Sequence, residues 1–366
     1  MKRLILTCFV FVLMVMLPMI NLKADNNLEL IYRSFVGEKS NYQGFIEIWN
    51  IDTFEGGNVG KYDILQSVAK EYQKENKGTY VIVRNVSESE CVNMLARGQF
   101  PDLFSCSYGV ASEIKEYVVP FDKSFDELYS NLLDAGNFDG EQYAIAWCYG
   151  SYYMFSTRTK IEKYFNENDK VSLSQIALST GYEKNNKNKK QIIYSLGFGQ
   201  GKYLLPQIAF SSYTGREIAL DKYALNVDAV KNNTPYDAYC DFLTGECTIL
   251  IGTQRDLIKL RNREVLGKID ELVVESVGGF TDLVQYMLIT NNSKQRYEYA
   301  QRFVQKLTEK KTQQKILESG LFSVDKNIKY EQNNGIMSNI TLENISSYTI
   351  HNVFLSKIKI EQLQKI

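Results

Sequence analysis

The chain has 366 residues, of which 44% are hydrophobic and 23% are charged. This length and apolar content suffice for about two globular domains and exclude a disordered or collagen-like chain. The 42 basic and 43 acidic residues nearly cancel, so the charge gives no sign of a nucleic-acid binder. The single histidine, His351, which we expect on the surface, argues against a His-ligated zinc site and a His general base.

The first residues predict an export signal. A short positive stretch, MKR, precedes an apolar run from Leu4 to Ile20, and Ala24 offers a small residue for cleavage. We expect residues 1–24 to be removed as a signal peptide, which makes the protein extracellular or attached to the cell surface. Because the run holds about 17 mostly apolar residues, an uncleaved membrane anchor is the competing interpretation.

The six cysteines form no metal-binding or redox motif. No CxxC pair is present, which argues against a zinc ribbon and a thioredoxin-like motif. Cys8 has too little apolar sequence before it for lipid attachment. Cys240 and Cys247 are close enough in sequence for a disulfide, and two buried free thiols are the alternative.

Alternating strand and helix patterns open the body of the chain. A helical spacing of apolar residues starts at Tyr62 and ends before Gly78, and a Ser87/Glu90 capping box opens a second helix. Connections of this length imply a parallel sheet whose ligands lie beyond the carboxyl ends of the strands. We expect strands over residues 45–50, 79–86 and 103–107.

The second half continues the pattern less regularly. Residues 143–157 predict one long aromatic strand, and a strand over 248–252 leads into a capping box of Thr253 and Asp256. A strand is expected over 284–290, followed by one amphipathic helix from Asn292 to about Ser319. The tail beyond residue 335 has no assignable pattern.

Six segments follow one another in a characteristic order and spacing: IEIWNIDTFEGG (46–57), GQFPDLFSCSYGV (98–110), DGEQYAIAWCYGSYYMFSTRT (139–159), FLTGECTILIGTQRDL (242–257), GGFTDLVQYMLIT (278–290) and FVQKLTEKKTQQKILESGLFS (303–323). Together they resemble the family 1 extracellular solute-binding proteins of ABC importers. The resemblance covers the chain from about Phe45 to Ser323.

The resemblance implies a periplasmic-binding-protein-like fold of two discontinuous α/β lobes that are joined by a hinge and close on a ligand, usually a carbohydrate. By that pattern the 139–149 segment crosses into the second lobe, 248–253 crosses back, and the chain crosses again after Thr290. The first lobe then comprises residues 40–140 and 252–290, the second comprises 141–251 and 291–335, and residues 336–366 form a C-terminal tail.

The predicted cleft edge combines aromatic rings with carboxylates, hydroxyls and a guanidinium. Sugars suit such a mixture because their C–H faces stack on rings while their hydroxyls need paired donors and acceptors. Asp102, beside Pro101, is expected to be structural instead. The candidate ligand-binding residues are Trp49, Asp52, Glu55, Ser105, Ser107, Tyr108, Trp147, Tyr149, Arg255 and Asp282.

These features favour a monomeric, cofactor-free and metal-free receptor that captures a sugar or oligosaccharide and delivers it to an ABC permease by hinge closure. The missing lipoprotein cysteine and the presence of only 2 Trp leave a second hypothesis open: a surface-tethered sensor, or a receptor for a non-sugar polar solute such as a polyamine. A third is a secreted carbohydrate-active enzyme that uses two carboxylates. Serine hydrolysis has no support, since the chain lacks a GxSxG elbow and a usable His.

Overall fold

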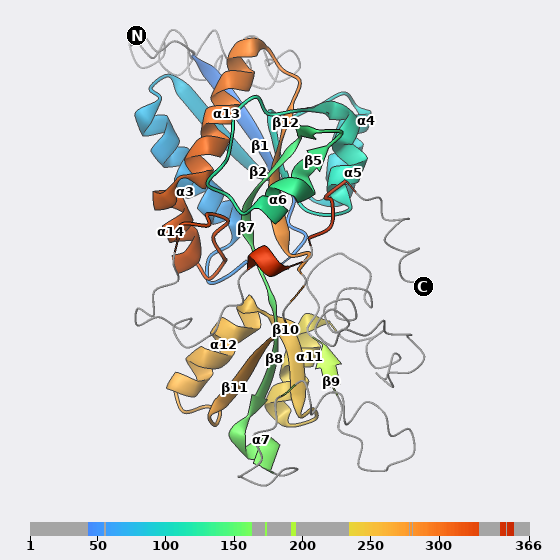
Figure 1. Ribbon diagram of the computed structural model, residues 1–366, viewed down its shortest axis with the longest axis vertical. Helices are drawn as coiled ribbons and strands as arrows, with labels where there is room; N and C mark the ends of the chain where they lie inside the picture. Colours follow the sequence, from blue (N-terminus) through green and yellow to red (C-terminus); the bar gives the residue numbers. More distant parts are fainter. Residues whose placement is uncertain are drawn as a thin grey trace, which may run out of the picture.

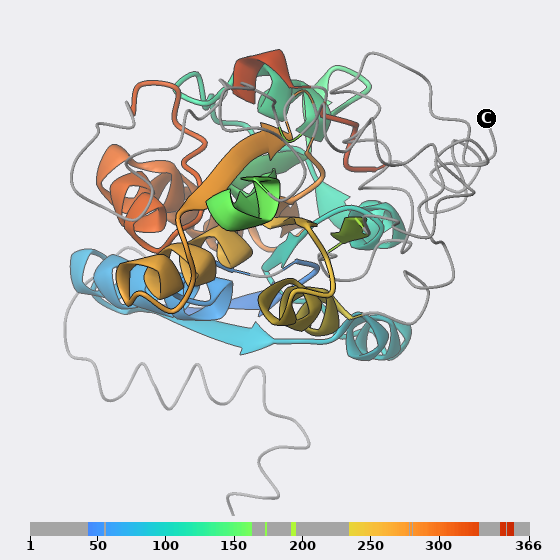
Figure 2. The same cartoon turned by 90° about the horizontal axis from the view of Figure 1, so that it is seen from below.

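The protein consists of two α/β lobes stacked along the long axis of the molecule, each built around its own sheet (Figure 1). Figure 2 shows the same arrangement from the side of the second lobe, with α11 and α12 in front. The computed structural model describes residues 43–54, 56–162, 173, 192–194, 234–277, 279, 281–328, 345–348 and 350–354.

The first lobe contains a mixed six-stranded sheet with the order β2-β1-β3-β12-β4, and β7 pairs with β12 beside this path. β1 runs parallel to β2 and β3, whereas β12 is antiparallel to β3, β4 and β7. The carboxyl ends of the parallel strands therefore meet at one edge of the sheet. The strands are β1 (Gly44–Asn50), β2 (Thr79–Asn85), β3 (Leu103–Cys106), β4 (Val118–Val119), β7 (Ala144–Tyr149) and β12 (Val284–Thr290).

Helices cover the first sheet. Apolar residues spaced three and four apart bury one face of α3 (Lys61–Glu75), and the chain turns beyond it at Gly78, whose φ of 94° is left-handed as expected. Tyr72 of α3 donates a 2.8 Å hydrogen bond to the Tyr299 carbonyl of α13, and its ring packs edge-on against Phe303. The other elements of this lobe are α4 (Glu88–Ala96), α5 (Val110–Ile114), η1 (Lys115–Tyr117), α6 (Ser130–Gly136), β5 (Asn137–Phe138), β6 (Glu141–Gln142), α13 (Lys294–Thr308) and α14 (Lys310–Glu318).

The second lobe has a four-stranded sheet with the order β11-β8-β10-β9. β8 is antiparallel to both β10 and β11, and β10 is parallel to β9. The predicted Thr253/Asp256 capping box is confirmed at the start of α12. The elements are β8 (Tyr152–Thr157), α7 (Arg158–Glu162), β9 (Ile192–Tyr194), α11 (Pro235–Thr244), β10 (Ile249–Thr253), α12 (Gln254–Val265) and β11 (Leu272–Val277).

Two expected elements are each divided in the structure. The strand predicted over residues 143–157 is interrupted at Gly150 and Ser151, where the chain leaves the first sheet and enters the second. The helix predicted from Asn292 to Ser319 breaks at Glu309, whose backbone is extended, with φ −58° and ψ 142°. The periodicity predicted the correct type of element in both cases. It does not show where the chain changes direction within a continuous apolar pattern.

The lobe boundaries also differ from those expected. β7 pairs with β12, so residues 144–149 belong to the first lobe, and the expected crossing at 248–253 is β10 of the second sheet. The chain returns between β11 and β12, which places α12 and β11 in the second lobe. α13 and α14 pack against α3, β12 and β7, so this part of the 291–335 segment belongs to the first lobe.

The structure decides between the two alternatives stated for Cys240 and Cys247. Cys240 and Cys247 are both free, so the disulfide alternative is not formed. Burial raises the pKa of Cys91 and of Cys247 to about 12, which keeps both protonated and unreactive at neutral pH. Among these residues no helix combines the length and the apolarity that a membrane crossing requires.

Candidate functional site

The lobes meet where the chain passes between the two sheets, and we call this region the seam. One crossing segment is Gly150–Ser151, and the other lies between β11 and β12 and includes residues 281–283. The two segments bond to each other: the Gly150 amide donates to the Leu283 carbonyl at 2.6 Å, and the Thr281 hydroxyl donates to the Gly150 carbonyl at 2.9 Å. Two short connections side by side are the arrangement a hinge needs, because few residues must absorb the backbone rotation.

Gln254, the first residue of α12, fastens the second lobe to this hinge. Its side-chain oxygen accepts from the Ser151 amide at 3.1 Å, and its backbone amide donates to the Ser151 carbonyl at 3.1 Å. A Cβ on Gly150 would lie 2.4 Å from the side-chain oxygen of Gln254, so a larger residue there would require Gln254 to move. Sequence reasoning missed Gln254, although two small residues within an aromatic run were a signal for the crossing.

Asp282 is a buried carboxyl group in the second crossing segment. It accepts a 2.8 Å hydrogen bond from the Tyr152 hydroxyl, while its carbonyl accepts from Ser107 at 3.4 Å. Burial raises the pKa of Asp282 to about 7, and the hydrogen bond from Tyr152 opposes this only in part. Asp282 and Ser107, both candidate ligand residues, are therefore brought together inside the hinge.

A polar network lies at the carboxyl edge of the first sheet. Asn50 donates to Asn85 at 2.7 Å and accepts from Ser105 at 3.0 Å. The Ser105 hydroxyl oxygen also lies 3.3 Å from the indole nitrogen of Trp147 and 3.1 Å from the amide nitrogen of Gln285. Ser105 and Trp147 are fully buried, so they form part of the interior beneath the seam.

The loop after β1 is held by a buried lysine. The Lys61 side chain has no exposed surface, and its ammonium group lies 3.3 Å from Asp52, donates to the Phe54 carbonyl and sits 3.5 Å from the centre of the Phe54 ring. A buried ammonium group requires such partners. The Asp52 side chain remains 42% exposed, so it neutralises Lys61 and still faces solvent. Glu55 lies outside the described residues.

Tyr108, at the carboxyl end of β3, is covered by the end of the chain. Its hydroxyl donates to the carbonyl of His351, and burial raises its pKa well above the usual value. Residues 345–348 and 350–354, hereafter the C-terminal segment, contain a short helical turn, η2 (Ile345–Ser347), that lies between the lobes in Figure 1. His351 is half-buried, and burial lowers its pKa, so the expectation of a surface position is corrected.

The C-terminal segment touches both lobes. Asn131 of α6 donates to the carbonyls of Ile345 and Tyr348 at 2.7 and 3.1 Å. On the other side, the hydroxyl of Tyr348 lies 3.4 Å from that of Ser276 on β11. Residues 345–348 and 350–354, which showed no sequence pattern, are therefore part of the seam.

The remaining candidates divide into two interior aromatic rings and one partly exposed arginine. Trp49 donates to Glu47 at 2.9 Å and packs edge-on against a core phenylalanine, and the buried Tyr149 ring lies tilted against Phe322, with 5.2 Å between the ring centres. Arg255 follows Gln254 in α12 and is half-buried, with its backbone amide donating to Thr253 at 3.3 Å. Asp52 and Arg255 are thus the described candidates that keep exposed surface.

The described candidate residues include groups that can bind a polar solute. No set of three or more His, Cys, Asp or Glu side chains within them is placed to hold a metal ion. The buried polar groups of the seam are mostly hydrogen-bonded to one another, which fixes the hinge and the floor of the first sheet. The exposed carboxylate of Asp52 can accept hydrogen bonds from the hydroxyls of a polar solute, and the guanidinium of Arg255 can donate to them.

No protein-family model matches the chain, and no curated protein matches it. Solved structures do. The GacH receptor of Streptomyces glaucescens, solved unliganded and with acarbose, is 14% identical, with a TM-score of 0.55 over 78% of this chain and 81% of that chain. An ABC substrate-binding protein from Listeria monocytogenes in complex with cycloalternan is 13% identical, with a TM-score of 0.52 over 78% and 81%. Maltose-bound MalE3 of T. maritima is 15% identical, with a TM-score of 0.53 over 77% and 82%.

At these identities the likeness establishes the fold. The chain has the periplasmic-binding-protein-like architecture of two α/β lobes expected from its sequence.

Proposed function

We propose that the protein is an exported solute-binding receptor that captures a carbohydrate between its lobes and delivers it to an ABC-type permease. The observation that carries the proposal is the two-lobed fold with a paired hinge, which matches receptors solved with acarbose, cycloalternan and maltose. A ligand that binds the closed arrangement better than the open one shifts the population toward closure.

Asp52 and Arg255 are the described side chains that we propose to contact the solute. Seven of the other candidates are buried within the fold, and a fully buried group cannot reach a ligand without rearrangement. A carboxylate accepts from sugar hydroxyls, and a guanidinium donates to them. Both groups are placed beside hydrogen-bonded elements, Asp52 by Lys61 and Arg255 by the N-terminal cap of α12.

Calorimetric titration with maltose, maltotriose and acarbose tests the proposal. Saturable binding without product release is expected, and a sugar at one hundred times its dissociation constant should add about 2.7 kcal/mol to the free energy of unfolding. Release of a smaller sugar would instead favour the enzyme hypothesis. Loss of sugar uptake in cells that lack the protein would support delivery to a permease over a sensor role.

A pair of matched variants locates the site. Arg255→Gln should weaken sugar binding, whereas Arg158→Gln should not, because Arg158 begins α7 at the surface and only pairs with Glu271 at 3.4 Å. Scattering with and without sugar should show a more compact molecule on binding. Equal sugar affinities for wild type and R255Q would remove Arg255 from the site.

A further inference from the structure

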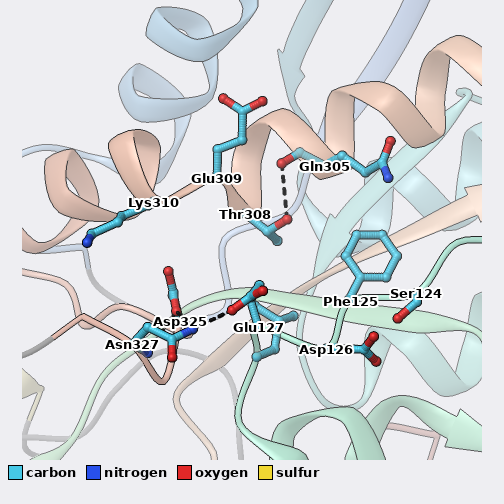
Figure 3. Close-up of a pocket in the computed structure, with 11 residues that line it drawn as sticks. Ser124, Phe125, Asp126, Glu127, Gln305, Thr308, Glu309, Lys310, Asp325 and Asn327 are labelled. Carbon is cyan, nitrogen blue, oxygen red and sulfur yellow. Dashed lines mark hydrogen bonds between the residues drawn. The ribbon is translucent and has the colours of Figure 1, made fainter.

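A cavity of about 630 Å³ lies in the first lobe, apart from the candidate residues of the seam. It is open to solvent on one side and is lined by the loop between β4 and α6, the bend between α13 and α14, and the chain that follows α14 (Figure 3). The lining residues are Ser124, Phe125, Asp126, Glu127, Leu128, Gln305, Thr308, Glu309, Lys310, Asp325 and Asn327.

Asp325 gives this cavity a preference for ligands that donate hydrogen bonds. It is only 4% exposed, yet it lines the cavity. One of its carboxylate oxygens accepts from the backbone amide of Asn327 at 2.8 Å and from the side-chain amide of the same residue at 3.1 Å. The other oxygen accepts no hydrogen bond within the described chain, and no lysine or arginine of that part forms an ion pair with Asp325. This second oxygen is therefore available to a hydrogen-bond donor that enters the cavity.

The surrounding groups increase the negative character on the same side. Glu127 accepts a hydrogen bond from the Asn327 amide, and the neighbouring Asp126 side chain is exposed. In Figure 3 the three carboxylates lie along one side of the cavity, and the Lys310 side chain extends away from Glu127 and Asp126. Glu309 also lines the cavity and pairs at 3.0 Å with Lys306, whose ammonium group Glu75 shares at 2.7 Å.

The size of the cavity and its apolar wall favour an organic molecule over a metal ion as the ligand. The cavity is much larger than a metal ion needs, and its carboxylates are not among any metal-binding set in the described residues. Phe125 and Leu128 supply apolar wall beside the carboxylates. Carboxylates only accept hydrogen bonds, so a fitting ligand brings several N–H donors, positive charge and an aliphatic portion.

We propose that this cavity binds a small organic cation with primary ammonium groups, such as a linear diamine, with one ammonium on Asp325 and Glu127 and its methylenes along Phe125. This site is separate from the sugar site proposed at the seam and does not depend on it.

Calorimetric titration of the full chain with 1,4-diaminobutane at low salt tests the assignment. Wild type should bind saturably, and the affinity should fall as sodium chloride is added. Asp325→Asn keeps an oxygen for the Asn327 amides but removes the charge, so it should lose about tenfold or more in affinity. Asp139→Asn makes the same chemical change in an exposed turn outside the cavity and should bind as wild type does.

Two further variants and a hydrogen-exchange measurement test the proposal independently. Glu127→Gln alters an exposed residue whose replacement leaves the core intact, and it should also weaken diamine binding. Arg255→Gln should leave diamine binding unchanged, and hydrogen exchange of residues 124–128 should slow when the diamine is bound. No binding by wild type, wild-type affinity in both D325N and E127Q, or loss of diamine binding in R255Q would each overturn the proposal.

Discussion

Replacing Asp282 with asparagine should make the stability of the protein less dependent on pH. The pKa of Asp282 is raised by burial from an ordinary value of 3.8 to about 7, and no neighbouring cation compensates for the burial. The groups around it are hydroxyls: Tyr152 donates to its carboxyl oxygen, Ser107 donates to its carbonyl, and the buried Tyr108 lies nearby. The asparagine side chain would keep an oxygen for the Tyr152 hydroxyl and would never ionise.

The sign and the size follow from proton linkage. A carboxyl group with a raised folded-state pKa contributes its full stability below pH 3.8, and that contribution is lost as the pH rises through about 7. Between these values the folded state holds one more proton than the unfolded state, so stability falls by about 1.4 kcal/mol per pH unit. From pH 5 to pH 8, wild type should therefore lose on the order of 3 kcal/mol relative to Asp282→Asn.

Urea unfolding of both proteins, measured at several pH values between 5 and 8, provides the comparison. Because other groups titrate in both proteins, the informative quantity is the difference between their free energies of unfolding at each pH. Tyr152→Phe should raise the pKa of Asp282 further, since the lost hydrogen bond favours the ionised form. Stability profiles of wild type and D282N that run parallel across this range would refute the reasoning.

Three other substitutions test separate parts of the seam. Trp147→Ala should destabilise the fold by about 3–5 kcal/mol, because the ring is fully buried, and chemical denaturation that showed less than about 1 kcal/mol would place the ring outside the core. Gly150→Ala should change the angle between the lobes, since the added Cβ would meet Gln254 at 2.4 Å; an unchanged scattering profile would contradict this. Tyr108→Phe should speed hydrogen exchange in the C-terminal segment by removing the bond to His351, and wild-type exchange rates would show that the bond does not hold the segment.

Local patterns predicted most of the regular elements. The strand at Val284–Thr290 has the expected bounds, and Ser87 accepts from the Glu90 amide at 3.2 Å, which is one of the two bonds of the predicted capping box. Asp102 is structural as expected: it is buried, accepts from the Glu47 amide at 2.8 Å and pairs with Arg296 at 2.8 Å. These features depend on residues close in sequence or on a single strong requirement, such as a buried carboxylate needing donors.

The site was harder to predict because its members come from distant segments. Ser105 was expected near the carboxyl end of a strand and Trp147 in the segment that crosses between the lobes, but the sequence could not show that their side chains bond to each other and lie inside. Lys61 was missed because a lysine at a helix start normally faces solvent, and only the partners in the preceding loop explain its burial. The lobe boundaries failed for the same reason, since β7 and β12 pair across more than one hundred intervening residues.

The pairing of β7 with β12 has a consequence for how the molecule is made. Tyr149 lies opposite Val284, so the whole second lobe is inserted between two adjacent strands of the first. During synthesis, every strand of the second sheet has emerged before β12 exists to complete the first sheet, and the elements that close the first lobe come later still. The second lobe can therefore fold before β12 is available to complete the sheet of the first lobe. We expect the inserted lobe to assemble first and the surrounding lobe to assemble after it.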